Sequence, residues 1–262
     1  MTGKFHVGPL AADALAFGEA VDTILAARDQ SRHFSVHFCT AHTVVEASRS
    51  EALRQALNDP SSLNTSDGMP LVWIGRLQGR KVERVYGPET MLAVLDRGRS
   101  LGYRHYFFGG TADTVQRLIE KLQARFPGLC VVGFEAPPFR PLTPEEDREV
   151  VQRMNDATPD CVWVGLGAPK QDLWVFEHRG RLSASALLAV GAAFDFHSGT
   201  KRQAPYWMQR SGLEWLFRLG SEPRRLWRRY TVVNVVFLSI VGREAVRSVL
   251  RRIAPTTSRR AP

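Results

Sequence analysis

The chain has 262 residues, of which 44% are hydrophobic and 23% are charged, and its formal net charge is +9. This length and composition suit one large globular domain, or a domain with an appendage, and exclude a collagen, a coiled coil or a disordered chain as its main class. There is no apolar run of about 18 residues, and residues 1–20 lack the basic start and apolar core of a secretory signal, so we expect a cytosolic protein without a membrane-spanning helix.

Several short apolar runs end in small or polar residues, and a helical pattern follows them. These runs predict strands at 34–39, 105–110, 128–139, 161–167 and 187–196. One helix is expected after Thr111, a plausible N-cap, and another opens at Thr143. Strands that alternate with helices indicate an α/β fold, in which a parallel sheet is covered by helices on both faces.

The three cysteines, Cys39, Cys130 and Cys161, fall within apolar, strand-like stretches. They share no C-x-x-C spacing, and their number is odd. We therefore expect buried, reduced thiols that belong to the core, and neither a disulfide framework nor a metal site.

Glycines and polar groups are concentrated after one of the predicted strands, in the sequence VWVGLGAPKQDLW at 162–174. Gly165 and Gly167 would let a backbone approach closely. Lys170 and Gln171 could reach a ligand there, because ligands of open α/β sheets bind at the carboxyl ends of strands, near helix N-termini. One interpretation is an anion or nucleotide pocket, with Pro169 in the first position of the next helix. The other is a tight strand-to-helix turn.

Common signatures of nucleotide and metal sites are missing. Lys170 stands where the third glycine of G-x-G-x-x-G would be, which disfavours a nicotinamide or flavin dinucleotide. Neither a G-x-x-x-x-G-K-[ST] phosphate loop nor a D-x-D pair occurs. We therefore expect no cofactor and no metal, and side chains and backbone would neutralise any phosphate charge.

Asp67 lies beside Gly68 in SDGMPLVW, just ahead of an apolar run. A carboxylate on a glycine turn at the rim of a sheet can accept a proton from a substrate hydroxyl, so Asp67 is a candidate general base. Asp-Gly is also an ordinary turn dipeptide, and that interpretation stays open from the residues alone.

Four further polar residues have the same ambiguity. Asp195 and His197 could contact a ligand or belong to a turn and the surface. Thr40 and His42 follow the first strong strand, where Thr40 is either a pocket residue or an N-cap and His42 either a ligand contact or a solvated histidine.

The positive charge is concentrated at the C-terminal end. Residues 221–262 contain ten arginines and two glutamates, a balance of +8 out of +9. The apolar residues between them, as in TVVNVVFLSIVG, are mostly Val, Leu and Ile. This pattern suits an interfacial helix on anionic lipid, or a packed helix with a basic face, better than base stacking on nucleic acid.

A series of motifs resembles the WecG/TagA/CpsF glycosyltransferases, glycosyltransferase family twenty-six. In chain order the matching stretches are SDGMPLVW, ERVYGPE, FFGG, PPF, VGLGAPKQDLW, VGAAFDFHSG and APYWMQRSGLEWLFRLGSEPRRLWRRY. They span most of the chain from Phe34 to Tyr230, and the ordered series is far more specific than any one motif.

The resemblance implies an inverting, metal-independent transfer of a sugar from a UDP-sugar to a polyprenyl-diphosphate-linked saccharide in bacterial surface polysaccharide synthesis. The implied location is the cytoplasmic face of the plasma membrane, with peripheral attachment to anionic lipid. The implied fold is a Rossmann-like catalytic domain, which we expect at 1–212, with a basic, membrane-associating appendage at 213–262. A homo-oligomer is left open, and no nucleic acid partner is expected.

By position in these motifs, Asp67 corresponds to the proposed base that deprotonates the acceptor hydroxyl. Thr40 and Gln171 match polar pocket positions. Arginines at the end of the chain are candidates to hold the donor diphosphate, as a cation would: Arg218, Arg224 and Arg228. The remaining candidates for substrate binding are His42, Gly109, Gly110, Gly165, Gly167, Lys170 and Asp195.

Three positions depart from the usual pattern of this family. His42 stands where asparagine is common, Asp172 where glutamate is common, and Gln203 where arginine is common. These differences concern the identity of the donor and acceptor sugars more than the reaction class. A non-catalytic module that binds a nucleotide-sugar and docks on anionic membrane is the alternative function.

Overall fold

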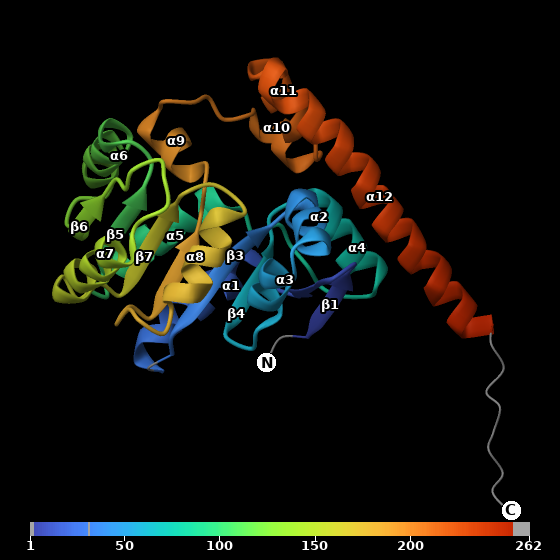
Figure 1. Cartoon of the computed structure of the whole chain (residues 1–262), viewed down its shortest axis with the longest axis horizontal. Coiled ribbons are helices and arrows are strands. Elements are labelled where there is room, and N and C mark those ends of the chain that lie inside the picture. Colours follow the sequence, from blue (N-terminus) through green and yellow to red (C-terminus); the bar gives the residue numbers. More distant parts are fainter. Residues whose placement is uncertain (1–2, 31, 254–262) are drawn as a thin grey trace, which may run out of the picture.

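The computed structural model describes residues 3–30 and 32–253, apart from the side chains of residues 225, 228, 229 and 248–253. Its centre is a six-stranded parallel sheet with the strand order β4-β3-β8-β7-β5-β6 (Figure 1). The strands are β3 (Phe34–Cys39), β4 (Ser62–Ser66), β5 (Arg104–Gly109), β6 (Cys130–Glu135), β7 (Cys161–Gly165) and β8 (Ala186–Ala189). Helices pack around this sheet, so the expected Rossmann-like α/β class is confirmed.

Helices connect the strands and cover both faces of the sheet. They are α1 (Phe17–Asp29), α2 (Ala41–Arg49), α3 (Glu51–Asn58), α4 (Met69–Leu77), α5 (Gly87–Arg99), α6 (Ala112–Arg125), α7 (Pro144–Asp156), α8 (Lys170–His178) and α9 (Ala193–Ser198). The hydroxyl of Thr111 accepts the Thr114 N–H, and that of Thr143 accepts the Glu146 N–H, so both helix starts expected from the sequence are confirmed.

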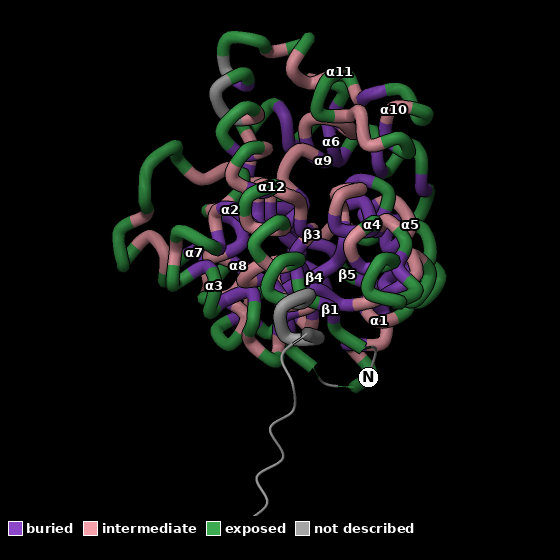
Figure 2. The backbone as a smooth tube through the Cα atoms, turned by 90° about the vertical axis from the view of Figure 1, so that its right-hand side faces the viewer, coloured by how far each residue is buried: buried purple, intermediate pink, exposed green. Residues whose placement is uncertain are grey.

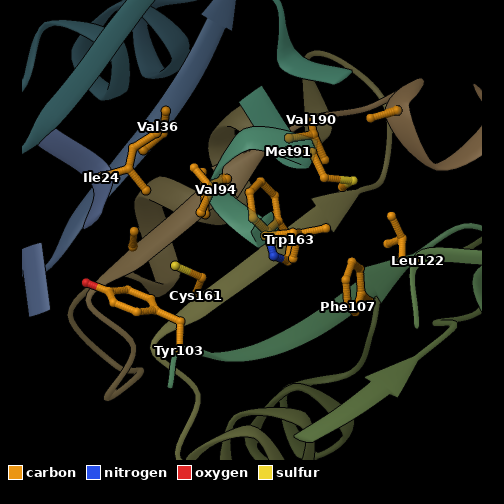
Figure 3. Close-up of a cluster of buried hydrophobic side chains, with 14 of the residues drawn as sticks. Ile24, Val36, Met91, Val94, Tyr103, Phe107, Leu122, Cys161, Trp163 and Val190 are labelled. Atoms are coloured by element: carbon orange, nitrogen blue, oxygen red, sulfur yellow. The ribbon is translucent and has the colours of Figure 1, made fainter. Parts of the chain in front are cut away.

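The alternation of side chains along β7 divides the core into two layers. Trp163 points into a cluster formed with α1, α5 and α6, where Figure 3 shows it near Met91 and Val94. Its neighbours Val162 and Val164 point to the opposite face, toward α7 and α8. Successive residues of a strand face opposite sides, and a parallel sheet buried on both faces therefore gives a continuous apolar run such as CVWVG. Burial is concentrated in this central sheet (Figure 2).

A hairpin formed by β1 (Lys4–Val7) and β2 (Leu10–Asp13) lies beside the sheet. This hairpin was not predicted from the sequence. Phe5 and Leu10 are buried in a third cluster together with apolar residues of α2, α3 and α4.

Three helices form the C-terminal part: α10 (Tyr206–Arg210), α11 (Glu214–Ser221) and α12 (Pro223–Ile253). In Figure 1, α10 and α11 lie near α9, and α12 runs down one side of the molecule. The Val233 and Phe237 side chains of α12 are buried in the cluster of the β1–β2 hairpin, and the Glu244 carboxylate accepts the Gly8 N–H at 2.8 Å. Within the described residues, no helix combines the length and the apolar character that crossing a membrane requires.

Three expectations were wrong. The predicted strand at 187–196 ends at Ala189, because the chain turns at Gly191, where φ is +53°, and residues 193–198 form α9. Cys130 is exposed, because it begins the edge strand β6; Cys39 and Cys161 are buried as expected. In addition, Pro169 immediately precedes α8 and is not its first helical residue.

Candidate active site

The carboxyl ends of β5 and β7 meet at a topological switch point of the sheet. The chain leaves β5 toward the edge strand β6, whereas it leaves β7 toward β8 on the other side. Crevices at such points are the usual ligand sites of open α/β sheets. Gly109, Gly110, Gly165 and Gly167 all lie here, and the Gly110 N–H donates to the Gly165 carbonyl at 3.2 Å. The structure therefore brings these four predicted residues together.

Close packing requires glycine at two of these positions, against backbone at Gly109 and against an aromatic ring at Gly165. At Gly109, where φ is +128°, a Cβ atom would lie 2.6 Å from the Gly165 carbonyl group. At Gly165 it would lie 2.8 Å from the Phe194 ring of α9. By contrast, a Cβ atom at Gly167 would meet nothing within 4 Å, although its φ of +81° favours glycine. Close packing thus accounts for Gly109 and Gly165. The tight-turn interpretation fits the positive φ of Gly167, which also leaves open space beside its backbone.

Gln171 braces the loop that contains Gly167. Its Oε1 accepts the Gly167 N–H at 3.0 Å, and its Nε2 donates to the Ala189 carbonyl at 2.8 Å. The side chain is buried, whereas the adjacent Lys170 is exposed. Asp172 faces the interior and lies 3.0 Å from the Nδ1 of buried His37.

Asp67 follows β4 at the same edge of the sheet. The N–H groups of Asp67 and Gly68 donate to the Cys39 carbonyl at 3.0 and 3.1 Å. A Cβ atom at Gly68 would lie 3.3 Å from the Cα of Thr40, so the Asp67 turn packs directly on the start of α2. Thr40 precedes α2, and the Nε2 of His42 in its first turn lies 3.8 Å from a Glu46 carboxylate oxygen.

Arg84 links Asp67 to the C-terminal helices. Its Nη2 lies 3.3 Å from Asp67 Oδ1 and 2.6 Å from Glu214 Oε2. The Gly87 N–H approaches Asp67 Oδ2 at 3.4 Å, and the Tyr86 hydroxyl donates to Glu214 Oε1 at 3.1 Å. Asp67, Arg84 and Glu214 side chains are each about one-seventh exposed.

Burial raises the pKa of Asp67 from 3.8 to about 7. The Arg84 cation and the Gly87 N–H oppose this shift, whereas the nearby negative charge of Glu214 adds to it. A carboxyl group with a pKa near neutral pH can both accept and release a proton there, which suits general base catalysis.

Arg84 and Glu214 were not predicted as site residues. Both lie inside motifs that carried the resemblance, ERVYGPE and GLEWLFRL. A charged residue in an otherwise apolar or turn-forming motif was the available signal. Their proximity to Asp67 could not be read from a sequence in which Arg84 and Glu214 are 130 residues apart.

A second charged region lies between α9 and α11. Asp195 pairs with Lys201 at 2.9 Å, and Lys201 also approaches Glu222 at 3.5 Å. The Arg218 guanidinium lies over the Phe196 ring, 5.8 Å from its centroid. A cavity of about 250 Å³ is lined by Phe196, Lys201, Arg202, Arg218, Ser221 and Glu222. Three of these residues are basic and Glu222 is acidic. Because Lys201 pairs with Asp195 and Glu222, Arg202 and Arg218 are the cations of this cavity that could meet an anionic group.

The other predicted residues are not in contact with Asp67. The His197 Nε2 bonds to the Pro88 carbonyl at 2.9 Å, and burial lowers the pKa of His197. Gln203 donates to the Tyr86 hydroxyl at 3.2 Å and so borders the Arg84 network. Arg224 is exposed in the first turn of α12, and the Arg228 side chain lies outside the described residues.

Comparison with known proteins adds independent information. The sequence profile described as "Glycosyl transferase WecG/TagA/CpsF family" matches residues 5–251. An N-acetylglucosaminyldiphosphoundecaprenol N-acetyl-beta-D-mannosaminyltransferase of Bacillus spizizenii is 30% identical over 179 residues, which cover 68% of this chain and 67% of the relative.

Proteins with the same name in two other bacteria are also similar. The one from Bacillus subtilis is 27% identical over 68% of each chain, and the one from Staphylococcus aureus is 26% identical over 74% of this chain and 71% of its own. The family expected from the motifs is thereby confirmed, and the chain belongs to the WecG/TagA/CpsF family of glycosyl transferases.

Proposed function

We propose that this glycosyl transferase moves a sugar from a UDP-sugar to a polyprenyl-diphosphate-linked saccharide in bacterial surface polysaccharide synthesis. The names of the relatives make N-acetylmannosamine the first donor sugar to test and N-acetylglucosaminyl-diphosphoundecaprenol the first acceptor. The observation that carries the proposal is the position of Asp67. It is a largely buried carboxyl at the carboxyl edge of the sheet, with a pKa raised by burial to about 7.

The proposed reaction is a single displacement with inversion. Asp67 removes the proton of the acceptor hydroxyl, the oxygen attacks the anomeric carbon, and the bond to the UDP oxygen breaks. Negative charge then develops on the departing diphosphate. We assign the stabilisation of that charge to Arg218 and Arg202, which line the cavity between α9 and α11. The Arg84 guanidinium stays next to Asp67 and stabilises its ionised form.

Peripheral attachment to anionic membrane is part of the same proposal. Large apolar side chains are exposed on the C-terminal helices, among them Tyr206, Trp207, Trp215 and Trp227. Exposed aromatic groups next to a concentration of arginines are suited to the interface of a bilayer, where rings lie at headgroup level and arginines meet anionic lipid. This surface would place the active site beside a lipid-linked acceptor.

The test is sugar transfer by the purified protein onto detergent-dispersed lipid-diphosphate acceptors, with a panel of UDP-sugars, no added metal and a chelator present. We expect UDP release that depends on the acceptor and is selective for one donor. UDP-sugar binding without transfer to any acceptor of the panel would favour the non-catalytic binding module. Absence of both binding and transfer would contradict the proposal.

A further inference from the structure

Helix α11 has few side chains that point toward the core. None of its residues is buried, and Trp215 and Leu216 on it are exposed by 38% and 46%. The Glu214 side chain is 15% exposed, and it extends from the start of the helix toward Arg84 and Tyr86. A carboxylate of the C-terminal appendage thus joins the charged network of the core.

The Arg84 guanidinium is shared unequally between two carboxylates. Its Nη2 lies 2.6 Å from Glu214 Oε2 but 3.3 Å from Asp67 Oδ1. The other Glu214 oxygen is fixed by the Tyr86 hydroxyl, and the Arg84 Nη1 donates to the Gln209 carbonyl of α10 at 3.0 Å. These contacts hold Nη1 and Nη2 toward the C-terminal helices, while Nε donates to the backbone carbonyl of Asp67 at 2.5 Å, so the pairing of Arg84 with the Asp67 carboxylate is only partial.

The other groups around Asp67 do not replace Glu214. Tyr86 stays neutral, because burial and the nearby carboxylates raise its pKa. The Cys39 thiol also stays neutral, because burial and the surrounding Asp charges raise its pKa well above the ordinary value. The two charged side chains that act most strongly on Asp67 are therefore Arg84, which favours its ionised form, and Glu214, which opposes it.

We propose that Glu214 is a positioning residue for Asp67: it holds the Arg84 guanidinium toward the appendage and thereby keeps the proposed base only partly paired. A fully paired Asp67 would be a weaker base, because a close cation stabilises the carboxylate. Docking of α11 thus sets the basicity of Asp67, which directly follows β4, through Arg84. This inference rests on the proposed role of Asp67 in transfer.

The test is the pH dependence of kcat/KM for Glu214→Gln against wild type. Removing the carboxylate charge releases Arg84 to Asp67, so we expect the midpoint of the profile to fall by about one pH unit. The rate at high pH should fall by about threefold, because a less basic Asp67 removes the proton more slowly. The ratio of variant to wild-type activity should therefore rise as the pH is lowered from about 8.5 to about 6.

Two variants separate this effect from a loosened appendage. Glu244→Gln removes the carboxylate that accepts the Gly8 N–H and so weakens another contact of the appendage without touching Arg84. We expect its midpoint to equal that of wild type. Glu214→Asp keeps the charge and should keep the midpoint within a few tenths of a pH unit. An activity loss in Glu214→Gln that is equal at every pH, or a shift also seen in Glu244→Gln, would overturn the inference.

The same shift can be measured without turnover, by NMR titration of the Asp67 carboxyl carbon in folded wild type and Glu214→Gln. A lower pKa in the variant supports the inference even if no acceptor has been found, and an unchanged or higher pKa overturns it. Failure of the proposed function would instead appear as a wild-type protein that transfers no sugar, so the two failures are distinguishable.

Discussion

The carboxyl edge of the sheet has two regions that are built differently. At the ends of β5 and β7, glycines bring backbones together, as where the Gly110 N–H meets the Gly165 carbonyl. At the ends of β3 and β4, Asp67 lies in a network of charged side chains with Arg84 and Glu214. The first region shapes the edge through close backbone contact between two neighbouring strands. The second is assembled from distant segments and supplies the ionisable group.

The two regions differ in which sequence pattern indicates a catalytic group. The glycine-rich stretch at 162–174 is the more conspicuous in the sequence, yet Gly109 and Gly165 are accounted for by close packing. Asp67 occupies an ordinary Asp-Gly turn, and its raised pKa arises only when distant parts of the chain bury it. If the comparison is right, changes in the glycine region act mainly on stability, and changes at Asp67 act mainly on turnover.

The largest expected effect is the loss of transfer in Asp67→Asn. The amide cannot take the acceptor proton, so kcat should fall by about 10²-fold to 10⁴-fold, with donor affinity nearly unchanged. The measurement is steady-state transfer together with UDP-sugar binding by calorimetry. Asp113→Asn, at an exposed position in α6, is the matched control and should keep wild-type kcat. Preserved turnover in Asp67→Asn would count against the charged region as the catalytic one.

The same variant should be more stable than wild type at high pH. The pKa of Asp67 is about 7 in the folded protein and 3.8 ordinarily, so the folded state holds this proton more tightly than the unfolded state. The stabilising contribution is complete below pH 3.8 and is lost as the pH rises through 7. Above pH 7, Asp67→Asn should exceed wild type in free energy of unfolding by up to about 4 kcal/mol, and the difference should vanish toward pH 4. Urea denaturation at several pH values measures it, and a variant less stable at pH 9 would be the contrary result.

In the glycine region, Gly109→Ala should destabilise the fold strongly. The new Cβ atom would meet the Gly165 carbonyl at 2.6 Å, and backbone on both sides would have to shift. We expect a loss of about 3 kcal/mol in the free energy of unfolding. Gly180→Ala is the control, because a Cβ atom there meets nothing within 4 Å, and its effect should stay within about 0.5 kcal/mol. Equal stabilities of the two variants would contradict the view that changes in the glycine region act mainly on stability.

Gln171→Ala tests whether the side chain that joins the glycine loop to β8 serves stability or ligand binding. It removes the bonds to the Gly167 N–H and the Ala189 carbonyl, so we expect a loss of about 2 kcal/mol in the free energy of unfolding. Gln152→Ala, at an exposed position of α7, should cost less than about 0.5 kcal/mol. If Gln171→Ala lowers donor affinity while stability is unchanged, Gln171 acts as a ligand contact, as the family motif implies, and not as a brace.

Much of the fold could be predicted from local patterns. The strand at 161–167 was recognisable because a parallel strand buried on both faces is nearly continuously apolar, and the strand at 34–39 because it is a short, mostly apolar run. The helix starts at Thr111 and Thr143 were recognisable because their caps are local. The strand predicted at 187–196 was too long, because its first apolar residues belong to β8, whereas those after the glycine turn belong to α9.

The site was less accessible to such reasoning. Asp67 could be identified as a candidate, but its distinction from a turn residue depends on burial and on charges that other segments bring. Arg84 lies 17 residues away in the sequence, and Glu214 lies a further 130 residues on. No periodicity or spacing in the sequence predicts that Asp67, Arg84 and Glu214 lie close together. Their proximity results from the docking of Glu214, at the start of α11, against Arg84 and Tyr86.

The most direct test of the central claim is the pH dependence of kcat/KM for sugar transfer by the wild-type protein. A base with a pKa of about 7 must lose its proton before it can act, so kcat/KM should rise tenfold per pH unit below about pH 7 and level off above it. A profile that is flat between about pH 5 and 9, or one with its midpoint near 4 as for an ordinary carboxyl, would contradict the assignment of Asp67 as the buried base.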